Sequence, residues 1–257
     1  MQYSAENHNM TRNLLLTLCY DGTKYHGWQV QKNALAVQEV FQEPLYRILG
    51  GEHDIKGCSR TDTGVHAREY CVSVATACPI PTQRLVAALN NSLPRDIAVL
   101  SCREVPLEFH ARYSCIGKEY IYQIWNGAVR NPFYEGYALQ YPYPLDLEKL
   151  NRAARCYLGE HDFSSFCSVG SKVEDTVRNV TVSELTREGD MVFFRTRADG
   201  FLYNMVRIMV GTLLRVAQGK FTPEEIPGIL AACDRAKAGP TAPACGLYLN
   251  KVLYGGF

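Results

Sequence analysis

The stretch from residue 204 to 218 constrains the fold of this chain more than any other segment. Read as a helix, it is apolar almost all the way round, so other elements must bury it on every side. Arg207 lies within it, and an unpaired guanidinium in such surroundings is strongly destabilising. A carboxylate from elsewhere in the fold must therefore reach Arg207. Asp199 and Asp62 are the two candidates, and the residues alone leave the choice between them open.

The chain has 257 residues, of which 47% are hydrophobic and 21% charged, as in an ordinary globular protein of one or two domains. Residues 1–9 are polar, so we expect no signal peptide. The longest strongly apolar stretch, residues 205–216, contains two arginines and is too short to span a bilayer. These features predict a cytoplasmic protein that does not enter the membrane.

Hydrophobic periodicity and turn signals predict a mixed set of elements. Five helices are expected: one that starts after residue 36, one from a cap at Thr82 to about residue 93, one after Asp146, one over 204–218 and one after a cap at Thr222. Pro44 should kink the first of them. Strands are expected at 13–20, 70–75, 97–105, 114–125, 176–186, 191–198 and 247–254. The order lacks strict strand–helix alternation, which favours an α+β fold with largely antiparallel sheets. A boundary near residue 108 would divide it into two mixed α/β domains, 1–108 and 109–257.

The net charge of +1 argues against a protein that coats nucleic acid through a large overall field. It does not exclude a locally basic surface, because residues 195–220 contain five basic residues and one acidic residue. Within this segment Arg195 and Arg197 alternate along one face of a predicted strand. That pattern fits a solvated surface or a track for phosphates equally well.

Ten cysteines raise the question of disulfides or a metal site. Their spacing gives no Cys-x-x-Cys pair, and none is followed closely by a pair of histidines. Several lie inside apolar strands, where a free thiol behaves as a small hydrophobe. We expect reduced, structural cysteines and no metal site.

Asp62 lies in a predicted loop that has Gly57 before it and Gly64 after it. Glycine-flanked loops often hold a functional group on an unusual backbone conformation, although an aspartate there is more often a turn residue or a helix cap. Arg60 and His66 flank Asp62 in the sequence. Side chains of these types in a polar loop are usually just solvated.

Tyr120 and Tyr122 alternate along a predicted strand, so both rings point to one face of it. Such a face commonly packs on a helix. It could also form a stacking platform for a base turned out of its RNA.

Five segments together resemble the motifs of the TruA-type tRNA pseudouridine synthases. They occur in the family's order and span roughly residues 11–254, as 58–67, 109–122, 159–166, 200–207 and 238–249. Departures are small: Ser59 stands where many members have glycine, and Tyr203 and Asn204 replace histidines often seen before Met-Val-Arg. The resemblance implies the pseudouridine synthase fold, with an active-site cleft between the two domains.

The resemblance further implies isomerisation of uridine in the anticodon stem-loop of tRNA, typically at positions 38 to 40, without a cofactor. Asp62 would be the catalytic carboxylate, and Arg207 would pair with it and lower its pKa. Tyr120 would stack on the uracil, its hydroxyl assisting proton removal, and Leu247 would pack against the base. Arg60 would steady the RNA after the uridine is flipped out. The family also suggests a homodimer.

Two other functions fit parts of the same pattern. One is a protein of this fold that binds tRNA without modifying it, which the intact Asp62, Tyr120 and Arg207 disfavour. The other is an aspartate-dependent hydrolase acting on a nucleoside or sugar. That chemistry normally calls for a second carboxylate or an activated water, and no acidic partner accompanies Asp62 in the sequence.

Overall fold

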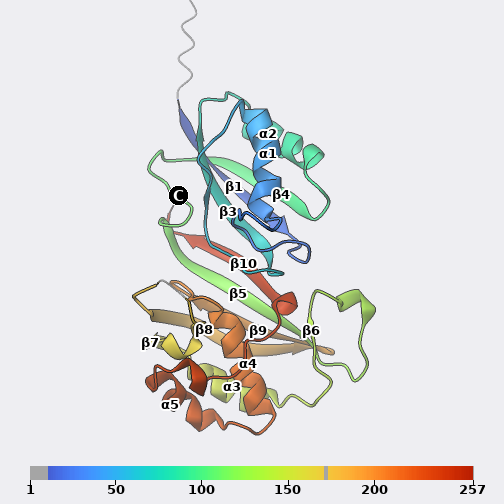
Figure 1. Ribbon diagram of the computed structural model, residues 1–257, viewed down its shortest axis with the longest axis vertical. Helices are drawn as coiled ribbons and strands as arrows, with labels where there is room; N and C mark the ends of the chain where they lie inside the picture. The colour runs from blue at the N-terminus through green and yellow to red at the C-terminus, as the bar shows by residue number, and fades with distance from the viewer. Residues whose placement is uncertain (1–10, 171–172, 257) are drawn as a thin grey trace, which may run out of the picture.

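A computed structural model describes residues 11–170 and 173–256, so the prediction that residues 1–9 form no signal peptide lies outside the described residues. Ten strands form a single mixed sheet, in the order β4-β1-β3-β10-β5-β9-β8-β7, with β2 beside β3 and β6 beside β5 (Figure 1). Most neighbours are antiparallel, whereas β10 runs parallel to β3 and β6 parallel to β5. The structure thus has the predicted α+β character with a largely antiparallel sheet.

The first half of the chain forms one end of the sheet. Its strands are β1 (Arg12–Tyr20), β3 (His66–Thr76), β4 (Ile97–Val105) and the short β2 (Lys56–Gly57). Helices α1 (Val37–Leu49) and α2 (Thr82–Ser92) cover one face of it (Figure 1). The apolar alternation of β1 explains this packing, because Leu14, Leu16 and Leu18 point to one side and are fully buried.

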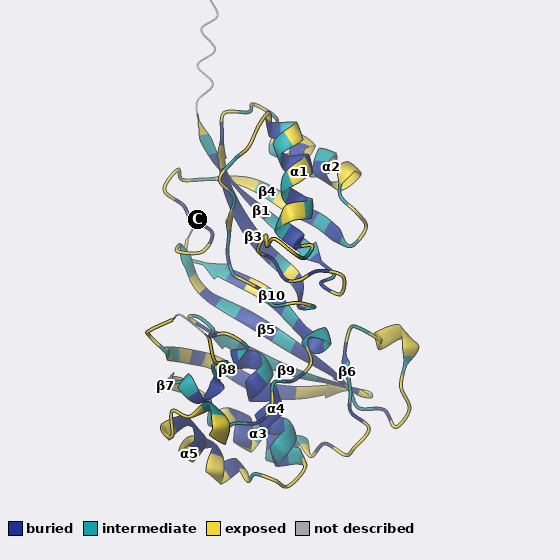
Figure 2. Ribbon diagram, in the orientation of Figure 1, coloured by how far each residue is buried: buried dark blue, intermediate teal, exposed yellow. Residues whose placement is uncertain are grey.

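The second half supplies β5 (Cys115–Trp125), β6 (Leu139–Gln140), β7 (Gly159–Asp162), β8 (Val177–Glu188) and β9 (Met191–Ala198). Helices α3 (Leu147–Arg155), α4 (Met205–Ala217) and α5 (Ile226–Ala231) gather below this part of the sheet (Figure 1). Nine of the thirteen residues of α4 are buried, as its composition requires. The buried residues continue through the centre of the sheet, while the outer helix faces are exposed (Figure 2).

The final strand, β10 (Leu247–Tyr254), joins the two halves. It lies between β3 and β5, and its register aligns Tyr248 with His66 on one side and Leu247 with Tyr122 on the other. The C-terminal motif at residues 238–249 therefore lies beside the loop that precedes β3. The connection between β4 and β5 spans residues 106–114, so the division at residue 108 falls in a loop and stays a prediction.

Several predicted details are wrong. Strand β3 begins at His66, four residues earlier than expected, which moves this histidine out of the loop. Thr82 is the first residue of α2 and makes no side-chain cap, since Pro81 occupies the N-cap position. The helix expected after Thr222 is split into a short 3-10 turn, Pro223–Glu225, and α5, although the capping box of Thr222 and Glu225 is present. Helix α1 contains Pro44 and is one continuous element, and the kink expected at Pro44 stays a prediction.

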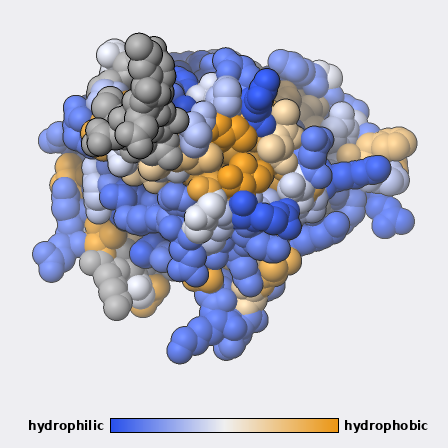
Figure 3. Space-filling model, turned by 90° about the horizontal axis from the view of Figure 1, so that it is seen from above, coloured by the Kyte–Doolittle hydropathy of each residue, from blue (hydrophilic) through white to orange (hydrophobic). Residues whose placement is uncertain are grey.

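All ten cysteines are free thiols. Over residues 11–170 and 173–256, no cluster of three or more His, Cys, Asp or Glu side chains is arranged to hold a metal ion. None of the helices in this described part is both long and apolar enough to cross a membrane. Seen from above, the end of the molecule formed by the first half is mainly hydrophilic, with a hydrophobic area near its middle and smaller ones toward its edges (Figure 3).

Candidate active site

Asp62 lies in the loop that joins β2 to β3, and neighbouring backbone fixes this loop on both sides. The Trp28 amide donates to the Thr61 carbonyl at 3.3 Å, and the Tyr20 and Thr61 hydroxyls are hydrogen-bonded at 2.8 Å. At Gly27 the backbone has φ +81°, and a Cβ there would stand 2.1 Å from the Thr61 carbonyl oxygen. Only glycine allows so close an approach, so residues 27 and 28 hold the Asp62 loop directly.

The turn after Asp62 is also closed by hydrogen bonds. The Val65 amide donates to the Asp62 carbonyl at 3.1 Å, and Gly64, with φ +77°, donates its amide to the Tyr25 carbonyl at 3.1 Å. A left-handed conformation at this position favours glycine. The glycine noted in the sequence therefore serves to shape the turn that carries Asp62.

The Asp62 carboxylate reaches across to the second half of the chain. Its Oδ2 lies 3.6 Å from Nη1 of Arg207, with 28% and 18% of the two side chains exposed. Asp199, the alternative partner, instead accepts a hydrogen bond from the Asn179 amide at 3.1 Å. The cation of α4 is thus paired with the aspartate of the glycine-flanked loop, a choice that the sequence left open.

Two further acceptors orient the Arg207 guanidinium. Nε donates to the Ala242 carbonyl and Nη1 to Oδ1 of Asn204, both at 2.7 Å. Asn204 precedes the helix in a left-handed conformation, with φ +60°, and its amide nitrogen donates to the Ser168 hydroxyl at 2.9 Å. Sequence reasoning missed this arrangement, because the asparagine stood out only as a departure from the family pattern.

Burial raises the pKa of the Asp62 carboxyl above its usual value, and the charge and hydrogen bond of Arg207 only partly oppose that rise. Arg207 thus lowers the pKa of Asp62 as expected, but burial has the larger effect and the net pKa is raised. The physical reason is desolvation, which penalises the ionised carboxylate more than the guanidinium at 3.6 Å favours it.

Tyr120 and Tyr122 share one face of β5, as predicted, but have different surroundings. Tyr122 is fully buried and donates its hydroxyl to the Pro243 carbonyl at 2.7 Å, so it is a structural residue. Tyr120 is 6% exposed and packs edge-on against Phe201 with ring centroids 5.0 Å apart. Burial raises the pKa of the Tyr120 phenol, which keeps it protonated at neutral pH.

Leu247 begins β10 directly opposite Tyr122 and is 5% exposed. Arg60, two residues before Asp62, is exposed. Among the described residues its guanidinium has no carboxylate within ion-pair distance. The structure therefore pairs Asp62 with Arg207, keeps Arg60 in the same loop as Asp62, and places Tyr120 and Leu247 in adjacent strands of the sheet.

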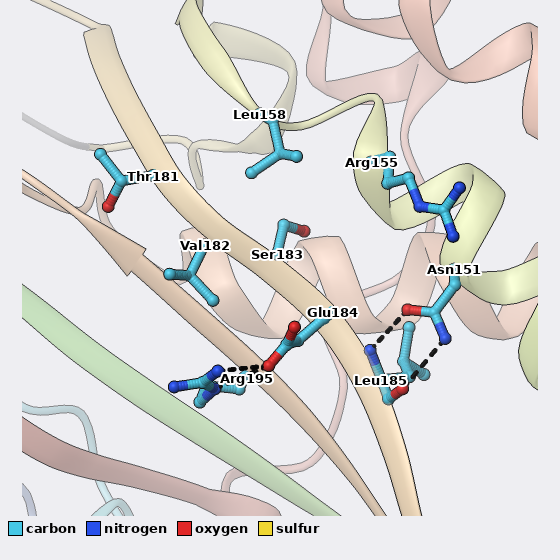
Figure 4. A pocket seen from close by; sticks show the side chains of 9 residues that line it. All are labelled: Asn151, Arg155, Leu158, Thr181, Val182, Ser183, Glu184, Leu185 and Arg195. Atoms are coloured by element: carbon cyan, nitrogen blue, oxygen red, sulfur yellow. Dashed lines mark hydrogen bonds and ion pairs between the residues drawn. The ribbon is translucent and has the colours of Figure 1, made fainter.

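Arg195 and Arg197 lie elsewhere. Their cross-strand partners on β5 are Ile121 and Glu119, which alternate with Tyr120, so both arginines project from the opposite face of the sheet. Glu119, almost fully buried, lies 2.6 Å from Arg197, and Arg195 pairs with Glu184. Figure 4 shows Arg195 turned toward Glu184 at the rim of a cavity of about 470 Å³. These carboxylates satisfy both guanidiniums, and the placement favours structural ion pairs over a phosphate track.

His66 was expected to be solvated, yet it is 1% exposed. Its Nδ1 accepts from the Gly22 amide at 3.1 Å, and its Nε2 lies 3.0 and 3.2 Å from the carbonyls of Gly136 and Cys245. Two carbonyl acceptors require the proton on Nε2, so the ring is the neutral Nε2–H tautomer. Burial lowers the pKa of His66, and the Asp21 carboxylate, 3.2 Å from Nδ1, only partly opposes that effect. One side chain thus joins the segment after β1, the loop between η1 (Pro132–Tyr134) and β6, and the C-terminal motif at residues 238–249.

Chemically, the site offers one partly buried carboxylate held beside a guanidinium, with a protonated phenol on β5. Ion pairs within the described residues bring no second carboxylate to Arg207. This set suits nucleophilic or general-base chemistry by a single aspartate rather than a paired-carboxylate hydrolysis. The Asp62–Arg207 pair thus joins the two halves of a continuous sheet, and its chemistry fits an enzyme that acts through a single carboxylate.

Comparison with known proteins specifies the class. A family model described as tRNA pseudouridine synthase matches residues 18–114 and 153–255, and the chain belongs to this family. Proteins named tRNA pseudouridine synthase A are 46% identical in Ruminiclostridium cellulolyticum and 44% identical in Clostridium acetobutylicum, covering 95% of this chain and all of each relative. The Brevibacillus brevis protein of the same name is 46% identical over the same shares. The residues matched by the family model include the Asp62 loop, α4 and β10, whereas β5 lies between the two matched segments.

Proposed function

We propose that this protein isomerises uridine to pseudouridine in tRNA and that Asp62 initiates the reaction. The observation that carries the proposal is the ion pair between Asp62 and Arg207, which joins two motifs 145 positions apart in a chain of this family. The names of the relatives supply the substrate, tRNA, and the product, pseudouridine.

The isomerisation breaks the bond between C1′ of ribose and N1 of uracil and forms one between C1′ and C5. A proton leaves C5 and another is gained at N1, so atoms and electrons balance without a redox or phosphoryl partner. Ionised Asp62 can begin this sequence by attacking the ribose, adding to the uracil ring or taking a proton from the sugar. All three routes require the carboxylate form, which Arg207 favours against the effect of burial.

Tyr120, Leu247 and Arg60 are the proposed contacts of the flipped nucleotide. Tyr120 and Leu247 offer apolar surface for the uracil, and Phe201 supports the Tyr120 ring from the side. The Tyr120 hydroxyl is the group proposed to assist removal of the C5 proton, and because burial raises its pKa it is protonated before the reaction begins. Arg60, exposed in the Asp62 loop, is positioned to fill the space that the flipped base leaves in the RNA stack.

We further propose the anticodon stem-loop, at positions 38 to 40, as the region modified, a homodimer as the active form and the cytoplasm as the location. The target positions and the dimer follow from the resemblance of the five motifs to the family, and the location follows from the polar residues 1–9 and the short apolar stretch 205–216. Mapping pseudouridines in tRNA from cells with and without this gene tests the target positions. The mass of the protein in solution tests the dimer, and a monomer at working concentrations would contradict it.

The activity is tested by release of tritium from tRNA labelled at C5 of uridine. We expect the wild-type protein to release tritium and Asp62→Asn to release none, with spontaneous deamidation of the variant excluded by mass spectrometry. A protein that only binds tRNA would release no tritium in either form. A hydrolase would instead yield free uracil, so chromatography of the products distinguishes the three functions.

A further inference from the structure

A second cavity, of about 440 Å³, lies at the far end of α4 from the Asp62–Arg207 pair. Its lining includes three cationic side chains, an aromatic ring and a stretch of backbone: Arg215, Lys220, Arg235, Phe221, Gly239 and Pro240. Arg215 lies in the last turn of the helix, while Arg235 comes from the short turn Arg235–Lys237 that follows α5. Cations from separate elements therefore converge on one hollow that plays no part in the proposed chemistry.

The cations of this hollow differ from Arg195 and Arg197 in their partners. Within residues 11–170 and 173–256, no carboxylate oxygen lies within ion-pair distance of Arg215, Lys220 or Arg235. Neutral oxygens orient the two guanidiniums instead. Arg215 donates to the Gln218 side chain at 3.2 Å, and Arg235 donates to the Gly239 carbonyl at 2.9 Å. Both side chains are held in place with their positive charge uncompensated.

Stabilisation of the helix end explains only some of the cations in this hollow. Cations near the end of a helix stabilise its unpaired carbonyl groups, and Arg215 and Lys220 stand at the end of α4. Arg235 belongs to another element, and its guanidinium is turned to the 239–241 backbone and the Thr241 hydroxyl, 3.3 Å away. Helix stabilisation therefore does not account for the convergence of all three.

A backbone segment, residues 239–242, links the hollow to the candidate active site. Residues 239–242 run along α4, where the Gly239 amide donates to the Thr212 hydroxyl at 2.9 Å and the Ala242 amide donates to the Arg207 carbonyl at 3.0 Å. Ala242 in turn accepts from the Arg207 guanidinium. Eight residues separate Arg207 from Arg215 on the helix, which corresponds to about 12 Å along its axis. That span is within reach of a single RNA strand that has its uridine at Asp62.

We propose that Arg215, Lys220 and Arg235 bind a backbone phosphate of the tRNA, on a part of the strand that runs from the target uridine along α4. This inference rests on the proposed function. Phosphate is the ligand that suits converging guanidinium and ammonium groups, since both donate charge-assisted hydrogen bonds to its oxygens. Phe221 adds a ring against which a ribose or base can pack. Such a contact positions the RNA without reading its sequence.

The test measures tRNA binding by the wild-type protein and by the double variant Arg215→Gln/Lys220→Gln over a range of salt concentrations. Each lost phosphate contact lowers the slope of log K against log salt by about 0.7 to 0.9, so the double variant should show a shallower slope and weaker binding. The charge-matched control is Arg47→Gln/Arg84→Gln, on the exposed faces of α1 and α2, where neither arginine has an ion-pair partner among the described residues. An unchanged slope in the cavity variant, or an equal change in the control, overturns the proposal.

Further measurements distinguish the alternatives. The charge-preserving variant Arg215→Lys/Lys220→Arg should retain the wild-type slope. If the cavity variant has a lower melting temperature but the wild-type salt slope, the cations only stabilise the helix and the proposal is wrong. Titration with inorganic phosphate separates a site for free phosphate from one for RNA: tight binding of phosphate that leaves tRNA affinity unchanged contradicts the RNA assignment. Tritium release by the wild-type protein, measured in parallel, reports separately on the proposed function.

Discussion

The Asp62 carboxylate stands 3.6 Å from the Arg207 guanidinium and is its ion-pair partner from the opposite half of the chain. Burial raises the pKa of Asp62 while Arg207 opposes the rise, so the carboxylate is held in its ionised form at some cost in stability. That tension is expected where a fold keeps a reactive group partly out of water.

The pH dependence of activity should report the opposing effects of burial and Arg207 on the pKa of Asp62. Because the reaction needs ionised Asp62 and burial raises its pKa, activity should rise with pH through an apparent pKa above the ordinary value of 3.8. The measurement is kcat for tritium release against pH with tRNA saturating. A plateau that extends below pH 4, in protein shown to remain folded, would contradict the raised pKa.

Substituting Asp62 should affect activity and stability in opposite directions. A carboxyl whose pKa is raised in the folded state stabilises it fully below the unfolded pKa, and this contribution is lost as pH rises through the folded pKa. At neutral pH, Asp62→Asn removes a desolvated charge, which offsets the loss of the anion that pairs with Arg207, and it keeps a neutral oxygen for the guanidinium. We expect abolished turnover with an unchanged or higher melting temperature, whereas a large drop in melting temperature would assign Asp62 a structural role.

Removing the charge of Arg207 should shift the pH profile. Without the guanidinium, only desolvation acts on Asp62, so its pKa should rise further and the acidic limb should move to higher pH in Arg207→Gln. Arg207→Lys keeps a cation but loses the fork that contacts Ala242 and Asn204 at 2.7 Å. We expect the lysine variant to retain more of the wild-type pH profile while losing kcat. Identical profiles for all three proteins would argue against coupling between Arg207 and Asp62.

Asn204 allows backbone and side-chain effects to be separated. Its left-handed backbone suits glycine, whereas the substitution Asn204→Ala would carry a penalty of roughly 1–2 kcal/mol. Asn204→Gly should therefore fold well but leave Arg207 without the Oδ1 acceptor, lowering kcat. Asn204→Asp would place a second carboxylate on Arg207 and raise the pKa of Asp62, which the pH profile can detect. Equal activity in the glycine and wild-type proteins would show that the side chain does not position Arg207.

His66 should make stability depend on mildly acidic pH. Its pKa is lowered from 6.5 in the folded protein, so the unfolded chain binds the proton more readily. Stability contributed by the neutral ring should therefore be present above pH 6.5 and be lost as pH falls toward the folded pKa. Melting temperatures measured from pH 5 to 8 should show this slope in the wild-type protein and a smaller one in His66→Gln. Parallel curves for the two proteins would locate the titrating group elsewhere.

The sequence alone determined the main helices and strands, although not the short β2, β6 and β7, and it determined that Arg207 needs an anion. Local periodicity and turn chemistry act over a few residues, and β4 (Ile97–Val105) and β10 (Leu247–Tyr254) occur at the predicted bounds. A cation inside an apolar helix is likewise visible in the sequence, because a helix that is apolar almost all round must be buried together with its cation.

Only the tertiary structure decided which carboxylate pairs with Arg207 and which other cations have no carboxylate partner among the described residues. The sequence did not distinguish Asp62 from Asp199 as the partner of Arg207. In the fold, β10 joins the two halves, and the Asp62 loop lies beside α4. The same assembly buried His66 in contact with three distant backbone segments. It also buried Asp62 enough for desolvation to outweigh the lowering effect of Arg207 on its pKa. Burial and partner choice depend on contacts between residues far apart in the chain, and spacing along the sequence does not encode them.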